Sequence, residues 1–356
     1  MIESINASID NLVVHQMGCK SLGEELRLSK TSMNPSEYEG VADILKDFFF
    51  RPFKTEAYFN LAAPEGGNNY VKHLMDELFA DATLFYQTSV SIAQLLDSCS
   101  NNPNIRGGEL YIAHFIDCAV DGQLCDAIGI FKSESKETFL RVVVGEGRVE
   151  LGAQEGISIK KLDKGCIIFN IESEEGYRVC AIDNINKGQE ARFWMDDFLG
   201  LKPREDNYFY TDNYLQMCKG FMNDVFNDEN HIPRTERIDL MNRSIEFFNN
   251  NPQFSQQQFQ EKVMSDTESI NDFDIIGEFD KYKQKYEEEH ELPQALPTEF
   301  EISKDAVKGE KKNFKSVIKL DKNFHVYVHG GRYYMEKGYD EGRDLNFYKL
   351  YYKIEQ

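Results

Sequence analysis

Residues 107–132 read GGELYIAHFIDCAVDGQLCDAIGIFK, and along this stretch the hydrophobic pattern of the chain takes a period of two. Alternating apolar, β-branched and aromatic residues are typical of strands, and Asp121-Gly122 is a typical tight hairpin turn. Connections as short as Gly145-Glu146-Gly147 allow only antiparallel neighbours, because a parallel crossover needs about a dozen residues. We therefore predict an antiparallel meander over residues 107–185. Its expected strands are 109–117, 124–132, 138–144, 165–171 and 177–183.

Helices are predicted on the amino-terminal side of this meander. Apolar residues recur at helical spacing from Val71 to Cys99, which indicates one long amphipathic helix that covers a face of the sheet. A shorter helix is expected at 38–50, after a hairpin that pairs residues 12–15 with 26–28. Helices that flank an antiparallel sheet, without alternating with parallel strands, indicate an α+β fold.

The second half of the chain is predicted to be a helical block followed by a small antiparallel sheet. Residues 227–301 hold 18 Asp and Glu against 7 Lys and Arg, so the block is acidic. Pro293 and Pro297 predict a linker, and strands are expected beyond it at 314–320, 324–328, 333–336 and 345–354. Four parts are therefore expected: an α+β domain (1–186), the acidic helical block (187–290), a linker (291–303), and a basic β segment (304–356) that packs on the block.

Composition limits the classes of function that the chain can have. Its 61 Asp and Glu exceed its 40 Lys and Arg, for a formal net charge of −21. Such a surface repels phosphates on average, which excludes a protein that coats DNA with its whole face. No apolar run approaches the roughly 18 residues of a membrane-spanning helix, and the first residues lack the pattern of a secretion signal. We therefore expect a soluble cytosolic protein without membrane contact.

No motif in the chain predicts catalysis or a bound cofactor. The seven cysteines include no Cys-x-x-Cys pair, so the spacing of a zinc ribbon is missing. Gly145-x-Gly147 lies between strands and fits a hairpin turn better than a dinucleotide-binding loop. Adjacent Asp196 and Asp197 diverge by about 100° on a helix, and Arg192 is placed to pair with one of them. We therefore predict a protein that is not an enzyme and holds no cofactor or metal.

One segment of the chain is basic. Residues 304–356 carry 12 Lys and Arg against 8 Asp and Glu, a net of +4, which leaves −25 for the other 303 residues. In the last predicted strand, Phe347, Lys349, Tyr351 and Lys353 share one face. Alternating cations and aromatics suit a groove that binds phosphates and stacks on bases. They also fit a solvated edge strand whose lysines prevent aggregation. The candidate nucleic-acid-binding residues, here called the basic strip, are Lys308, Lys311, Lys312, Lys315, Lys319, Lys322, Lys349, Tyr351 and Lys353.

A resemblance to a known family rests on three stretches. Residues 191–200, ARFWMDDFLG, resemble the aromatic, acidic helix ending Asp-Phe-Leu-Gly of the bacterial nucleoid-associated protein family typified by NdpA. Residues 13–15 and 110–115 each place a histidine where that family tends to have one, and the order of elements is similar over nearly the whole chain. The family supplies no catalytic site to carry over. The resemblance implies a cytoplasmic protein found with the nucleoid, through contacts with DNA or with DNA-bound proteins.

Three classes of function follow from these observations. If the basic strip binds DNA and neutralises about five phosphates, the log–log salt slope should be about −4 to −5. Reversal of Lys311, Lys312, Lys315 and Lys319 to Glu should then abolish duplex binding at low salt. Alternatively, the acidic helical block is an adaptor that docks a basic, DNA-bound protein. A third and weaker class is an enzyme that acts on nucleic acid and needs a divalent metal. Exposed strand edges are also compatible with a homodimer.

Overall fold

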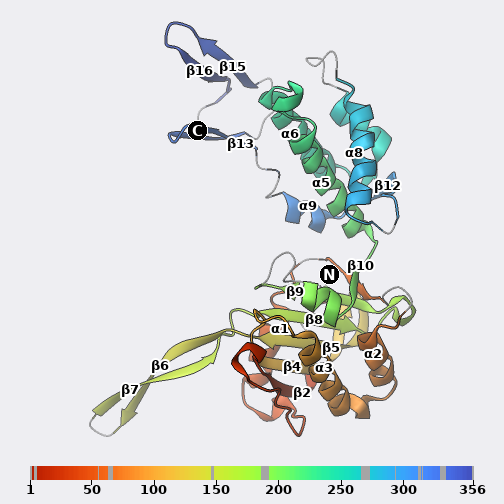
Figure 1. Ribbon diagram of the computed structural model, residues 1–356, viewed down its shortest axis with the longest axis vertical. Coiled ribbons are helices and arrows are strands. Elements are labelled where there is room, and N and C mark those ends of the chain that lie inside the picture. The colour runs from red at the N-terminus through yellow and green to blue at the C-terminus, as the bar shows by residue number, and fades with distance from the viewer. Residues whose placement is uncertain are drawn as a thin grey trace. The chain divides into compact units, whose positions relative to one another are not determined.

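The computed structural model separates two compact units, Met1–Arg204 and Glu205–Gln356 (Figure 1). Both units combine helices with antiparallel strands, which confirms the predicted α+β class. None of the described helices is long and apolar enough to cross a membrane. The structure describes residues 2–3, 6–54, 56–62, 67–145, 148–185, 192–265, 273–292, 294–311, 314, 316–328 and 334–354.

The first unit is built on an antiparallel sheet that has eight strands among the described residues. The strand order is β1-β4-β5-β8-β9-β3-β10, and β2 also pairs with β4. The predicted turn joins β4 to β5, with positive φ at Asp121 and Gly122 as a type I′ hairpin requires. The strands are β1 (Ile2–Glu3), β2 (Ser8–Met17), β3 (Phe59–Leu61), β4 (Gly108–Val120), β5 (Gln123–Ser133), β8 (Lys164–Phe169), β9 (Arg178–Asp183) and β10 (Leu201–Pro203).

The predicted meander is wrong at one point. The strand expected at 138–144 is β6 (Lys136–Gly145), and it leaves the main sheet to pair with β7 (Arg148–Ile157). The two strands form a hairpin that projects from the unit (Figure 1). β5 pairs instead with β8, and Lys132 and Lys164 are register partners across the base of the hairpin. A short turn requires antiparallel pairing, but it does not require that the hairpin stay in the parent sheet.

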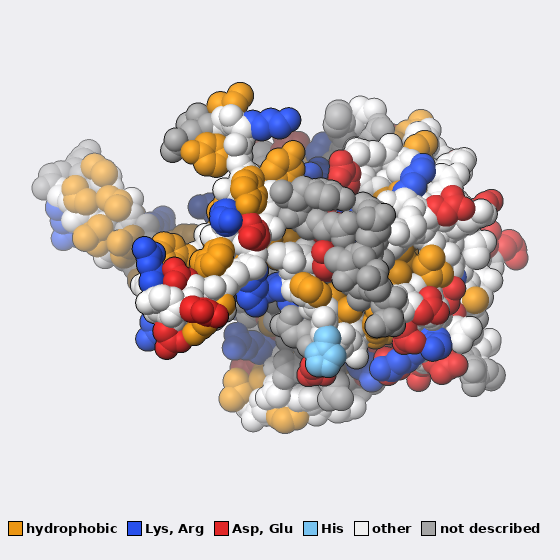
Figure 2. All heavy atoms as spheres, turned by 90° about the horizontal axis from the view of Figure 1, so that it is seen from above, with side chains coloured by type: hydrophobic (Ala, Val, Ile, Leu, Met, Phe, Trp, Pro, Cys, Tyr) orange, Lys and Arg blue, Asp and Glu red, His pale blue; other side chains and the backbone are white. Residues whose placement is uncertain are grey.

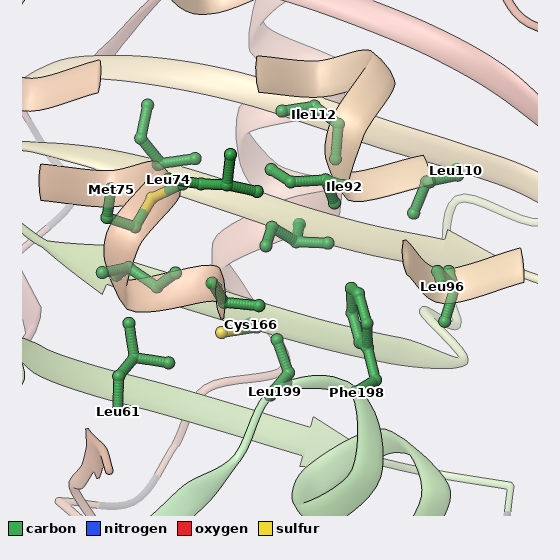
Figure 3. Close-up of a cluster of buried hydrophobic side chains, with 14 of the residues drawn as sticks. Leu61, Leu74, Met75, Ile92, Leu96, Leu110, Ile112, Cys166, Phe198 and Leu199 are labelled. Carbon is green, nitrogen blue, oxygen red and sulfur yellow. The ribbon is translucent and has the colours of Figure 1, made fainter. Parts of the chain in front are cut away.

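Helices cover both faces of the main sheet. On one face, α2 (Tyr70–Ala80) and α3 (Phe85–Cys99) bury apolar side chains such as Ile92 against Ile112 of β4 (Figure 3). On the other face, α1 (Val41–Phe50) inserts Phe49, whose ring stacks on Phe131 of β5 at 4.1 Å. Side chains alternate along β4, so one strand contributes to both cores.

Two amino-terminal predictions need correction. The helix expected from Val71 to Cys99 is divided, because Asp81 is extended and its carboxylate accepts a hydrogen bond from the Thr83 amide at 3.0 Å. An Asp that caps a new helical turn competes with continuation of the helix before it. The expected hairpin is also reduced, since residues 26–28 contribute only a bridge between Gln16 and Arg27.

The second unit packs its helices around an aromatic core. Phe221, Phe248, Phe254 and Phe279 are fully buried or nearly so. A short sheet of β11 (Gln253–Ser255) and β12 (Glu299–Glu301) closes over this core. Its helices are α5 (Asn207–Asp224), α6 (Arg234–Asn250), α7 (Gln256–Phe259), α8 (Ile275–Glu289) and α9 (Lys304–Glu310). The apolar spacing of residues 267–289 predicts one helix there. α8 begins at Ile275, and residues 266–272 lie outside the described part.

Candidate nucleic-acid interface

The carboxy-terminal strands form two hairpins, where the sequence predicts one small sheet. β13 (Ser316–Leu320) pairs with β14 (Phe324–Val328), and β15 (Met335–Asp340) pairs with β16 (Leu345–Leu350). Ile318 of β13 and Met335 of β15 are buried together with Ile238 of α6. Each hairpin is thus anchored on α6, with Leu320, Val326, Val328 and Tyr348 partly buried against the same cluster. Many of the other side chains are exposed.

A groove of about 850 Å³ lies on these hairpins. Three cationic side chains line it: Arg234 from the first residue of α6, Lys319 from β13 and Lys337 from β15. Three aromatic rings line the same groove, those of Phe324, Phe347 and Tyr348, and its acidic members are Asp321 and Asp344. The lining therefore combines a small cationic excess with aromatic surface.

The three cations differ in how firmly they are held. Arg234 donates from Nη2 to the Val317 carbonyl at 3.1 Å, which ties the start of α6 to β13. Lys319 and Lys337 are exposed and make no ion pair with a described residue. Their ammonium groups are therefore available to an anionic ligand. Seen from above, apolar side chains lie between the scattered Lys, Arg, Asp and Glu on the left of the view, where the hairpins lie (Figure 2).

Only part of the basic strip meets at this groove. Lys319 lines it, and Lys322 is exposed in the turn between β13 and β14. Lys308 is exposed on α9, and Lys311, just after α9, lines a different cavity beside Phe314. Lys353 is exposed beyond β16. Lys312 and Lys315 lie outside the described residues.

Lys349 and Tyr351 share a single carboxylate. The Lys349 ammonium lies 3.0 Å from Oε2 of Glu336, and the Tyr351 hydroxyl donates to the same oxygen at 2.6 Å. These hydrogen bonds, first that of Tyr351 and then that of Lys349, lower the pKa of Glu336. The ammonium also lies 5.9 Å from the centre of the Tyr351 ring, so the two side chains share a face. Glu336 balances the charge of Lys349, which makes this pair a weaker anion site than Lys319 or Lys337.

Sequence reasoning missed two of the three groove cations, Arg234 and Lys337. Arg234 is far from the hairpins in the sequence, and only the packing of α6 brings it to β13. Lys337 could have been found, because it alternates with Tyr339 on β15 just as Lys349 alternates with Tyr351. In the hairpin, Lys337 lies opposite Tyr348.

Residues 192–200 contribute buried side chains to the core of the first unit. Phe193–Phe198 form a π-helix whose Trp194 is fully buried, and the chain turns at Gly200 with a φ of 62°. The predicted pair of Arg192 with Asp196 is confirmed at 3.4 Å. The apolar spacing of residues 187–199 predicts a helix, and its first part, residues 187–191, lies outside the described residues.

Asp196 and Asp197 both line a cavity of about 460 Å³ beside Tyr70. Within the described residues, no group of three His, Cys, Asp or Glu is placed to hold a metal ion. Two neighbouring carboxylates without a third ligand are a weak cation site, so this cavity offers less chemistry than the groove.

Comparison with known proteins adds one positive finding. A family model described as nucleoid-associated protein YejK (NA37) matches residues 13–345. That range includes Arg234, Lys319 and Lys337 and ends before Lys349. None of the curated proteins matches the chain.

Proposed function

Because the chain belongs to the NA37 family of nucleoid-associated proteins, we propose that it binds DNA directly through the groove on its carboxy-terminal hairpins. Family membership places the chain with the bacterial nucleoid, and hence in the cytoplasm. The proposed role is binding without catalysis. Divalent-metal-dependent cleavage of DNA or RNA by the purified protein would contradict that part of the proposal.

The observation that carries this proposal is the composition of the groove. Cations that neutralise phosphates beside aromatic rings that stack on bases are the usual means by which proteins hold single strands. Phe324 is exposed, so its ring is accessible to a base. The chain as a whole carries a net charge of −21, which on average disfavours contact of DNA with the rest of its surface. Three neutralised phosphates would give a log–log salt slope of about −2 to −3, shallower than the full basic strip would give.

Two double variants with the same change in net charge test the groove against the strip. Lys319→Glu with Lys337→Glu reverses two groove cations, and Lys308→Glu with Lys311→Glu reverses two strip lysines away from it. We expect the first to abolish binding of labelled single-stranded and duplex oligonucleotides at low salt, and the second to bind like wild type. Fluorescence anisotropy over a salt series measures both the affinity and the slope.

The other outcomes of this experiment are equally informative. Equal loss in both double variants would favour the whole basic strip, or a general effect of net charge, over the groove. Unchanged DNA binding in both variants would exclude the hypothesis that these lysines contact DNA directly. Melting curves of both variants show whether a loss comes from unfolding, since all four lysines are exposed and their reversal should leave the fold intact.

A second candidate function is an adaptor that binds a basic, DNA-bound protein. It is supported by the exposed carboxylates that follow one another at the end of α8, at Glu288, Glu289 and Glu291. Long-range attraction between such an acidic surface and a basic partner would speed their association. Affinity capture from a nuclease-treated lysate tests it. The adaptor predicts that a Glu288→Lys, Glu291→Lys variant loses its partner and the groove variant keeps it.

A further inference from the structure

The hairpin of β6 and β7 has an apolar face that no described residue covers. Opposite residues in an antiparallel pair project to the same side, and three such pairs are apolar: Leu140 with Ala153, Val142 with Leu151, and Val144 with Val149. The exposed fractions are 79% for Leu140, 56% for Val142, 78% for Val144, 63% for Val149 and 73% for Leu151. Hydrophobic side chains dominate the faint projection at the left of Figure 2.

The opposite face of the hairpin is different in character. There Arg141 lies across from Gly152, Val143 across from Glu150, and Phe139 across from Gln154. The hairpin is therefore amphipathic, with one apolar and one mixed face. A two-stranded hairpin alone is marginally stable in water, and a contiguous apolar patch on a surface usually marks an interaction site.

The charge of the hairpin indicates what covers this face. Residues 136–157 hold three Lys and Arg against four Glu, a net of −1, which leaves −20 for the rest of the chain. Two copies would repel each other over most of their surface, and the hairpin is a place where they can approach. The three apolar pairs carry no charge, and the charged residues on the same side, Lys136 and Glu155, lie at the base of the hairpin, away from its tip. The outer part of this face therefore offers no cation to a phosphate and no carboxylate to a basic protein. A second copy of the same face is complementary to it.

We propose that the hairpin β6–β7 is a self-association arm, and that the apolar faces of two copies pack on each other around a two-fold axis. An isologous contact of this kind buries both faces at once and closes as a dimer. A face of two ten-residue strands covers roughly 35 by 10 Å, which is less than half of the about 800 Å² per partner in a standard interface. A contact this small gives a weak and reversible dimer, so the dimer should form only as the protein concentration rises.

A matched pair of substitutions tests this arm. Val142 and Val143 are adjacent, exposed valines that point to opposite faces of one strand. Val142→Lys places a charge in the proposed contact, and Val143→Lys places the same charge on the mixed face. Sedimentation velocity of the full chain over a wide concentration range is the measurement. We expect wild type and Val143→Lys to shift from monomer to dimer as concentration rises, and Val142→Lys to remain monomeric.

Two results would overturn the proposal. Wild type that stays monomeric up to high micromolar concentration would exclude the second copy as the occupant of this face, even if another protein is captured there. Equal association of Val142→Lys and Val143→Lys would place any dimer contact elsewhere. The groove variant Lys319→Glu, Lys337→Glu should still self-associate, which separates failure of this proposal from failure of the proposed function.

Discussion

Two lysines are buried inside the first unit at the base of the hairpin. Lys132 donates to Oε1 of Glu134 at 2.9 Å and to the Arg106 carbonyl at 2.6 Å. Lys164 donates to both carboxylate oxygens of Asp183, at 3.0 and 2.9 Å, and lies 3.8 Å from Glu134. Burial lowers the pKa of Lys132, and its carboxylate partner opposes that shift. The cluster is stable only while every charge in it has a partner.

Removal of one charge from this cluster should be costly. We expect Lys132→Met to lower the free energy of unfolding by about 3 kcal/mol, because Glu134 and the Arg106 carbonyl each lose a buried donor. Lys136→Met is the control, since its pair with Glu109 at 3.0 Å is largely exposed on the lysine side. That substitution should cost less than about 1 kcal/mol. Denaturant titration of both variants measures the difference, and equal costs would contradict the prediction.

A half-buried carboxyl in the second unit should make stability depend on pH. Burial, and then the charge of Glu310, raises the pKa of Asp212 from 3.8 to about 6, against a hydrogen bond from Gln216. The pKa of Asp212 is higher in the folded state than in the unfolded state, so its protonation stabilises the fold. This contribution to the free energy of unfolding is complete below about pH 4 and is lost as the pH rises through 6.

Asp212→Asn removes this titration and should stabilise the protein at pH 7 by at most about 3 kcal/mol, the equivalent of a shift of about two pKa units. The advantage should shrink toward zero as the pH falls to 4. Unfolding free energies of wild type and variant across this range are the measurement, and a pH-independent difference would refute the assignment.

At the scale of elements, one side chain joins α2 to the turn after the π-helix. Asn69 is buried, and its Nδ2 donates to the carbonyls of Ala62, Leu199 and Gly200 at 3.1, 2.9 and 3.1 Å. Its Oδ1 accepts from the Lys72 amide at 2.9 Å and so caps α2. The end of the family-like stretch is therefore held in place by a residue 130 positions earlier.

Loss of Asn69 should destabilise the first unit. We expect Asn69→Ala to cost about 2 to 3 kcal/mol, from the lost cap and from carbonyls left without a donor. Asp81→Ala removes only an exposed cap and should cost about 1 kcal/mol. Asn69→Asp keeps the cap acceptor but cannot donate, so nearly the full cost of Asn69→Ala is expected. Thermal melts of the three variants give the ranking, and a harmless Asn69→Asp would show that the carbonyl contacts contribute little.

Elements whose signals are local could be predicted from the sequence. The turn at Asp121-Gly122 gives β4 and β5 their pairing because positive φ at both residues favours the type I′ turn. The partner of β5 beyond the hairpin could not be predicted, because Lys132 meets Lys164 across 31 intervening residues. The same limit applies to the groove, where the contact of Arg234 with β13 depends on helix packing. Likewise, the neutralisation of Lys349 by Glu336 depends on the register of β15 and β16.

At the scale of the whole molecule, the two units have separate cores. The buried clusters of the first unit and those of the second share no residue. We expect two thermal transitions in calorimetry, and fragments 1–204 and 205–356 should each unfold cooperatively. Fragment 205–356 should keep the DNA affinity of the groove, since all of its lining residues belong to that unit. A single transition, with neither fragment folded, would contradict the prediction.

The place where the hairpin of β6 and β7 leaves the main sheet has an evolutionary consequence. β5 and β8 are already neighbours, and Asp163 accepts hydrogen bonds from the amides of Glu134 and Ser135 at 2.7 and 2.9 Å across the gap. The hairpin is thus an addition to the main sheet, whose strands pair with one another without β6 or β7. A deletion or swap within β6 and β7 that keeps Ile157 and Leu162 would change the hairpin while the contacts of these two residues with the core stayed in place. Such a change in a relative would alter the hairpin and leave the pairing of β5 with β8 as it is.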